Sequence, residues 1–291
     1  MNQAVQIERV GPISPEQFWA EYVDVSRPVI LTGIVERWPA FKRWSPEYFK
    51  REFGSTAVAA ERQLSKDPEE HVGRRDLLQT TLGSLVDRIS AGDEPKHYLS
   101  EWMVFEKIPS LAHDLGSLDH YQRMRRSYPE SLQRRMQLKP TLWFGPAGAY
   151  TTLHRDPGDN LLAQIMGRKK VIMFPADQER ELYYPWHEMC RPECCLAGWS
   201  PIDVEAPDLE RFPLYANATP YECMLGPGEI LFIPIHWWHH VSSLDTVISV
   251  STWWFRRLRD WRPSTATWVP RRDAVECWLR QRQRRLVSAR D

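Results

Sequence analysis

Long apolar runs are missing from this 291-residue chain, and so is an excess of charge of either sign. No segment reaches the roughly 20 apolar residues that a membrane-crossing helix needs, so we expect no membrane partner. The 38 basic residues balance 38 acidic ones. This balance argues against a nucleic-acid partner bound by the charge of the whole molecule.

Cysteine is scarce, with five residues in the chain, and an odd count does not suit a disulfide framework. The first ten residues, MNQAVQIERV, lack the apolar core of an export signal. We therefore expect reduced thiols and a cytoplasmic location. Internal repeats and low-complexity tracts are also lacking, so a single compact domain is the simplest interpretation.

Tryptophan and proline are abundant, at 14 and 23 residues. Prolines punctuate turns, as at Gly145-Pro146 and Gly226-Pro227. Short apolar or alternating runs separated by such turns fill residues 141–174 and 221–254, and neither stretch contains a pattern of helical length. This texture predicts a mainly β core of antiparallel strands, closed or sandwiched.

Helix signals flank this core. Ser-Pro-Glu begins two predicted helices, at Ser14 and at Ser45, because serine caps a helix and proline suits its first position. Residues 81–90 predict a third helix, and the run DAVECWLRQRQRRL (273–286) predicts a fourth. Short strands are expected at 27–35 and 96–99.

The domain organisation follows from this order of elements. We expect one domain over residues 1–260, with a barrel core at about 95–255 and a helical and strand elaboration over 1–94. Residues 261–291 form the predicted helical tail. Its apolar stripe and Trp278 favour a homodimer interface, although a solvated basic helix or an acidic partner would also explain the charges.

The motif His154-Arg155-Asp156 places an imidazole and a carboxylate two residues apart. Positions i and i+2 of a strand face the same way, so both can point at one ion. A third ligand is available among His236, His239 and His240. Two histidines and one carboxylate on one side of an ion are typical of non-haem Fe(II) oxygenases.

Two longer motifs surround these residues. The first is T-x-x-H-x-D-x-x-x-N-x-x-A-Q-I-x-G-x-K over residues 151–169, and the second is PGE-x-L-x-I-P-x-x-W-W-H-H-V-x-S-L over 227–244. With them, the chain resembles the JmjC (cupin-like) family of 2-oxoglutarate oxygenases over about residues 98–254. It is similar in particular to the subgroup that contains the asparaginyl hydroxylase of hypoxia-inducible factor.

The resemblance implies a double-stranded β-helix, that is, a jelly-roll or cupin core. It implies that His154, Asp156 and His239 are the catalytic Fe(II) ligands. His239 is chosen because the family ligand stands two places before the valine of the second motif. His240 would then point to the other face of its strand, as a packing or hydrogen-bonding residue, and His236 would lie in the preceding turn.

The resemblance also implies a binding site for 2-oxoglutarate, with O2 as the second cosubstrate. A buried dicarboxylate needs a fixed cation and hydroxyl donors at its far carboxylate. Lys169 matches the family lysine that supplies this charge, and Tyr98 and Thr151 match the hydroxyl donors. The other matching positions are Asn160, Trp253 and Ser251, the last of which replaces a family asparagine.

Three further features have competing interpretations. Lys169 and Lys170 are adjacent, and strand alternation turns only one of them inward. Arg155 lies between two predicted ligands, so we expect it to face away from the metal, in a structural role or at the pocket rim. The cluster His187, Cys190, Cys194 and Cys195 has no standard zinc spacing, and a substrate-side loop is the better hypothesis.

The function implied is hydroxylation of an unactivated C–H, with a protein or peptide side chain as the leading substrate. A free amino acid or small metabolite is an alternative substrate, and N-methyl-lysine demethylation is an alternative reaction. A non-enzymatic cupin-like binding protein is the alternative from another class. The three predicted ligands and Lys169 count against it, because a binding module does not need all of them.

Overall fold

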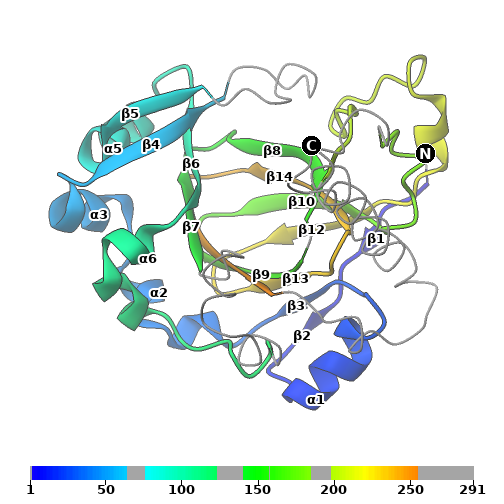
Figure 1. The fold of residues 1–291 in the computed structure, drawn as a ribbon, viewed down its shortest axis with the longest axis horizontal. Helices are drawn as coiled ribbons and strands as arrows, with labels where there is room; N and C mark the ends of the chain where they lie inside the picture. Colours follow the sequence, from blue (N-terminus) through cyan, green and yellow to red (C-terminus); the bar gives the residue numbers. More distant parts are fainter. Residues whose placement is uncertain (1, 64–75, 123–139, 157, 185–197, 255–291) are drawn as a thin grey trace, which may run out of the picture.

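The computed structural model describes the chain outside the ranges drawn in grey in Figure 1, namely residues 2–63, 76–122, 140–156, 158–184 and 198–254. Its framework is two β-sheets that together form the mainly β core expected from the sequence. None of the described helices is long and apolar enough to cross a bilayer.

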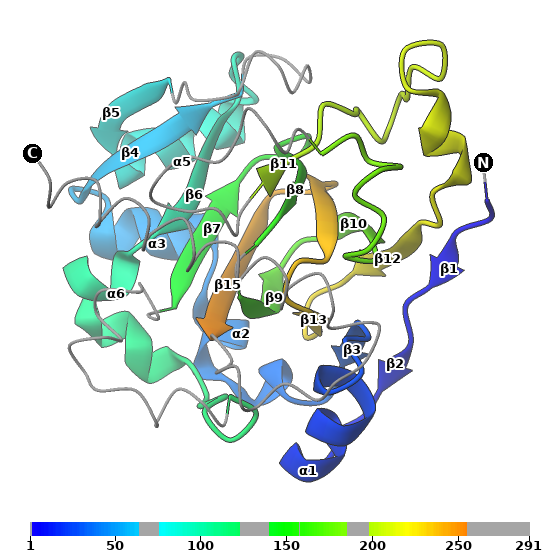
Figure 2. The same cartoon turned by 45° about the vertical axis from the view of Figure 1, so that its right-hand side comes forward.

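The six-stranded sheet carries the predicted metal ligands. Its order is β1 (Val5–Gln6), β12 (Tyr221–Leu225), β10 (Lys169–Phe174), β14 (Trp238–Ser243), β8 (Tyr150–Arg155) and β11 (Gly198–Trp199). Neighbouring strands are antiparallel except for β1, which pairs with β12 in parallel. Figure 2 shows β11 beside β8, where it forms the last strand of this sheet.

The nine-stranded sheet forms the opposite wall. Its order is β2 (Arg9–Val10), β3 (Val29–Leu31), β13 (Ile230–Ile233), β9 (Asp159–Met166), β15 (Val247–Trp254), β7 (Thr141–Gly145), β6 (His97–Trp102), β4 (Ala57–Arg62) and β5 (Leu77–Thr81). Four of these strands, β2, β3, β4 and β5, come from the first 81 residues of the chain. The N-terminal elaboration therefore extends the barrel sheet itself.

The described helices lie mainly in the N-terminal part, with α2, α3 and α6 beside β6 and β7 in Figure 1. They are α1 (Pro15–Phe18), continued by a π-helical turn at Trp19–Val23, α2 (Pro39–Arg43), α3 (Pro46–Phe53), α5 (Leu82–Ala91) and α6 (Val104–Lys107). Short 3-10 turns occur at Val35–Arg37, Pro109–Asp114 and Pro213–Asn217.

Three of these helices begin as the sequence predicts. The hydroxyl oxygens of Ser14, Ser45 and Thr81 each accept a hydrogen bond from the backbone N–H three residues later, which satisfies a donor that the first helical turn leaves open. The predicted strand at 27–35 is shorter, because Val35–Arg37 forms a 3-10 turn. The β4–β5 pairing was not predicted.

The three largest apolar clusters hold the layers together. The largest packs the N-terminal helices against the nine-stranded sheet, with Phe49 and Phe144 fully buried. A second lies between the sheets around Leu162 and Val171. The third covers the outside of the six-stranded sheet and includes Trp238. Each fully buried large side chain stabilises the fold by about 1.5–3 kcal/mol.

Candidate functional site

His154 and His239 lie directly opposite each other on the paired strands β8 and β14. Their ring centroids are 4.1 Å apart. Asp156 follows the last residue of β8, and its carboxylate oxygens lie 3.9 Å from His154 Nε2 and 3.7 Å from His239 Nε2. One ligand atom from each residue lies within 4.8 Å of the other two, so a single ion can contact all three.

Backbone carbonyls orient both rings. His154 Nδ1 lies 2.7 Å from the Thr152 carbonyl, and His239 Nδ1 lies 3.0 Å from the Trp237 carbonyl. Because a carbonyl can only accept a hydrogen bond, Nδ1 carries the proton and the Nε2 lone pair points to the centre. Burial lowers the pKa of His239 to about 4, and nearby His154 adds to this effect. The His239 imidazole is therefore neutral at physiological pH, and its Nε2 lone pair is available to a metal ion.

Asp156 is held from two sides. The indole N–H of Trp253 donates to its Oδ2 at 3.1 Å, and the backbone N–H of His236 donates to its carbonyl at 3.2 Å. His236 itself lies in the turn before β14, with a left-handed φ of 61°. This turn thus fixes a ligand through its backbone.

His240 lies on the other face of β14. Its Nε2 is 3.7 Å from Glu205, and its ring stacks on Tyr150 with centroids 6.4 Å apart. Strand alternation thus separates the adjacent histidines as the sequence predicts. Of the three histidines considered, His239 is the one whose ring lies against His154 and Asp156.

All nine residues predicted for the site line one cavity between the two sheets. They are Tyr98, Thr151, His154, Asp156, Asn160, Lys169, His239, Ser251 and Trp253. They come from six strands of both sheets and from the turn after β8. The fold therefore brings the metal-ligand candidates and the cosubstrate candidates together in a single space.

Lys169 supplies the cation of this cavity. Its Nζ donates to the Tyr98 hydroxyl at 3.2 Å and lies 5.7 Å from the ring centroid of Trp143. Lys169 and Tyr98 are buried, which lowers the pKa of Lys169 to about 7 and raises that of Tyr98. Burial disfavours the charged form of each group, so an anion beside Lys169 would restore its charge.

Two polar atoms of the cavity have no hydrogen-bond partner among the described residues. They are Thr151 Oγ1 and Asn160 Oδ1, and both atoms are buried. A buried polar atom without a partner costs about 1–3 kcal/mol. A dicarboxylate that filled the cavity would give the Thr151 hydroxyl an acceptor and Lys169 a counter-charge. The residues present thus fit iron with 2-oxoglutarate.

A β-bulge explains how Thr151 and His154 share this cavity. They are three residues apart, so regular alternation would send them to opposite faces. The register with β14 shifts between them: His154 faces His239, whereas Thr151 faces Val241. One extra residue of β8 is accommodated there, and both side chains reach the cavity.

Five lining residues were not predicted from the sequence, and two of them, Trp143 and Glu101, carry polar groups. Trp143 donates its indole N–H to Ser251 Oγ at 3.0 Å, so Ser251 accepts a hydrogen bond here. Glu101 is exposed and also lines the cavity, with a left-handed φ of 47° at an irregularity of β6. Neither belongs to a recognisable motif, and only the fold reveals them.

Among the other candidates, Arg155 faces away from the metal site as expected, but it is fully buried and not at a pocket rim. Its guanidinium pairs with Glu179 at 2.6 Å. Lys170 is partly exposed whereas Lys169 is buried. The His187–Cys195 cluster and the predicted tail at 261–291 lie outside the described residues.

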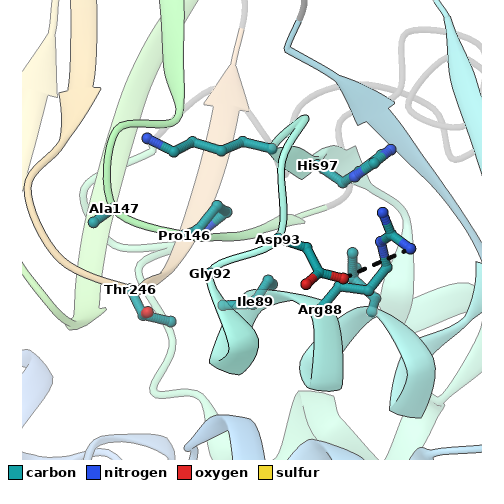
Figure 3. A pocket seen from close by; sticks show the side chains of 10 residues that line it. Arg88, Ile89, Gly92, Asp93, His97, Pro146, Ala147 and Thr246 are labelled. Carbon is teal, nitrogen blue, oxygen red and sulfur yellow. Dashed lines mark ion pairs between the residues drawn. The ribbon is translucent and has the colours of Figure 1, made fainter.

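A second cavity lies between α5 and the turn at Pro146 and Ala147 (Figure 3). The Arg88 guanidinium on its wall is 3.8 Å from Asp93, and Lys96 Nζ is 3.7 Å from Glu94. These cations already have carboxylate partners. No residue predicted for the metal or cosubstrate site lines this cavity.

Comparison with known proteins agrees with this geometry. The family model described as a cupin-like domain matches residues 15–260. Lysine-specific demethylase 8 of Xenopus tropicalis is 36% identical over 254 residues, which are 87% of this chain and 54% of that protein. The lysine-specific demethylase JMJ30 of Arabidopsis thaliana is 32% identical, over 86% of this chain and 54% of that protein.

A human relative matches over most of both chains. The bifunctional peptidase and (3S)-lysyl hydroxylase JMJD7 is 28% identical over 84% of this chain and 82% of its own length. The chain spans about half the length of the two demethylases. The narrower likeness to the asparaginyl hydroxylase subgroup stays a prediction. With the family match over residues 15–260, this chain belongs to the cupin-like (JmjC) family of 2-oxoglutarate-dependent oxygenases.

Proposed function

We propose that this protein is an Fe(II)- and 2-oxoglutarate-dependent dioxygenase that hydroxylates an unactivated C–H of a protein or peptide side chain. The observation that carries the proposal is a single cavity in which Lys169 lies alongside His154, Asp156 and His239. The same cavity holds the Thr151 hydroxyl oxygen, which has no hydrogen-bond partner within the described part of the chain. An iron site alone would not need a buried lysine. A buried lysine beside an iron site suits a dicarboxylate cosubstrate.

Different residues of the cavity would bind the iron and the 2-oxoglutarate. His154, Asp156 and His239 would hold iron on one side and leave its other positions open. Lys169, with Tyr98 and Thr151, would bind the far carboxylate of 2-oxoglutarate. When bound, iron and 2-oxoglutarate supply oxygen activation, in which 2-oxoglutarate becomes succinate and CO2 while one oxygen atom enters the substrate C–H bond.

The protein itself contributes position and exclusion of water. Trp253 fixes the Asp156 carboxylate, and the backbone carbonyls of Thr152 and Trp237 fix the imidazoles. The apolar side chains of Leu162, Ile233 and Val241 line the same cavity. A rigid ligand set in a largely buried cavity reduces the reorganisation that the reaction requires.

A protein substrate is supported by the relatives, which are named as lysine demethylases and a lysyl hydroxylase. Glu101 provides a carboxylate where the cavity meets solvent, and Trp143 and Trp253 provide aromatic faces. A carboxylate with aromatic rings suits a cationic side chain. Peptides that contain lysine or arginine are therefore the first substrates to test, with the free amino acids as the small-molecule alternative.

Demethylation of N-methyl-lysine is the second candidate reaction, because two of the compared relatives carry that name. Mass spectrometry of the treated peptide separates the two. Hydroxylation adds one oxygen, whereas demethylation removes one methylene and releases formaldehyde. A mass loss with formaldehyde would replace the hydroxylase assignment.

The enzyme assignment itself is tested by succinate release from 2-oxoglutarate in the presence of Fe(II) and a peptide pool. We expect turnover with the native chain and none with His154→Ala or Asp156→Ala. Equal succinate release by both variants, or none by the native protein with peptides and amino acids alike, would contradict the proposal and favour a cupin-like binding protein.

A further inference from the structure

Arg155 stands between two of the proposed iron ligands in sequence, yet its side chain lies on the opposite face of β8. It is fully buried, which is rare for an arginine. His154 and Asp156 line the cavity on one side of the strand, and Arg155 enters the apolar cluster on the other side. The packing of its guanidinium therefore bears on the strand that carries His154 and leads directly into Asp156.

Among the described residues, the side chains of Glu179, Tyr184 and Trp238 contact the guanidinium. Glu179 Oε1 accepts a hydrogen bond from Nη1 at 2.6 Å. The ring centroids of Tyr184 and Trp238 lie 4.3 Å and 5.3 Å from the Arg155 Cζ. These two rings also pack edge to face, with centroids 5.3 Å apart. Arg155 is thus held by one charge and two aromatic rings.

These contacts reach the third ligand as well. Trp238 directly precedes His239 and is paired with Arg155 across β8 and β14. Gly198 of β11 is paired with Arg155 from the other side, and a Cβ at Gly198 would overlap the ring of Tyr184. One buried group therefore connects the backbone of all three proposed ligands to β11 and to the turn after β10.

Fold stability alone does not explain a charge in this position. Apolar side chains of similar volume often replace a buried ion pair with no loss of stability. A guanidinium held by a carboxylate has directional bonds that an apolar side chain lacks, so it fixes one position of the strand. Some residues do not touch a metal but hold its ligands in place, and mutation of such a residue typically lowers metal affinity by about 10–100-fold.

We propose that Arg155 is a positioning residue, and that its pairing with Glu179 sets the geometry and affinity of the metal site. The proposal rests on the proposed function, because it takes His154, Asp156 and His239 as the ligands. Arg155 does not reach the cavity, so its effect would pass through the backbone of β8 and through Trp238.

The experiment is a titration of the metal-free protein with Co(II), followed by calorimetry and by the visible ligand-field spectrum. Arg155→Met and Glu179→Gln should each weaken Co(II) binding about 10–100-fold and change the spectrum. Arg155→Lys, which keeps the charge, should recover part of the affinity. Unfolding curves without metal would show that each variant is folded at the temperature used.

Arg43→Met is the control, because Arg43, which is about half exposed, also pairs with a buried carboxylate, Asp114, at 2.7 Å, and neither residue lines the cavity. It should lose stability while binding Co(II) as the native protein does. Native-like affinity and spectrum in folded Arg155→Met and Glu179→Gln would overturn the proposal. A native protein that binds no Co(II) would instead contradict the proposed iron site.

Discussion

Lys169 and Tyr98 are joined in the cavity by a hydrogen bond of 3.2 Å, although 71 residues separate them. They belong to different sheets, since β10 lies in the six-stranded one and β6 in the nine-stranded one. Their contact closes the space between the sheets on the side where an anion is expected. We therefore expect the charge of Lys169 to affect both the stability of the fold and the binding of 2-oxoglutarate.

Without a cosubstrate, Lys169 should make stability depend on pH. Its pKa is about 7 in the folded protein and about 10.5 when unfolded, so the unfolded chain binds more protons between these values. The unfolding free energy contributed by this group should rise from pH 7 to pH 10, by up to about 1.4 kcal/mol per unit. Urea unfolding of Lys169→Met should lack this slope, and an identical slope would refute the assignment.

Binding of 2-oxoglutarate should take up a proton at pH 8. The dicarboxylate favours the charged form of Lys169, so the pKa of Lys169 rises on binding. The affinity for 2-oxoglutarate should therefore fall as the pH increases above 7. Calorimetry in two buffers with different ionisation enthalpies measures the proton count. We expect uptake approaching one proton for the native protein, and no uptake would mean that Lys169 does not meet the carboxylate.

Thr151→Val should weaken 2-oxoglutarate binding without lowering the stability of the protein. The Thr151 hydroxyl has no partner among the described residues, so its removal should leave the unfolding free energy of the cosubstrate-free protein unchanged or slightly higher. Its loss should weaken 2-oxoglutarate binding by about 1 kcal/mol, roughly fivefold. A variant that is destabilised but binds normally would show that this hydroxyl serves the fold.

Trp253 and Trp143 form a matched pair of indole donors. Trp253 donates to Asp156, and Trp143 donates to Ser251. Trp253→Phe should weaken metal binding about tenfold by freeing the carboxylate, whereas Trp143→Phe should leave metal binding intact and weaken 2-oxoglutarate binding. Equal effects of the two variants on a metal titration would mean that the Trp253 bond has no special role.

The turn-separated short runs predicted the β core, strand alternation paired His154 with Asp156, and the resemblance to the JmjC family supplied the other candidate residues. Alternation along a strand puts residues two apart on one face, and the resemblance selects His239 from three neighbouring histidines. Asp156 was expected on the strand itself, yet β8 ends at Arg155, and a turn fixed by His236 presents the carboxylate instead.

Other features depend on distant partners that no local pattern encodes. The bulge of β8 that turns Thr151 toward His154 is visible only in its register with β14. The ion pair between Arg155 and Glu179 joins a strand to a turn 24 residues later. The strands β4 and β5 were missed because their stability comes from pairing with each other and with β6.

The central claim is that His154, Asp156 and His239 bind iron in the cavity that also binds 2-oxoglutarate. Its most direct measurement is the charge-transfer absorption that forms when Fe(II) and then 2-oxoglutarate are added without oxygen. His239→Ala and His240→Ala are neighbouring variants on opposite faces of β14. We predict that the band forms in the native protein and in His240→Ala but not in His239→Ala. A band that persists in His239→Ala and disappears in His240→Ala would contradict the account.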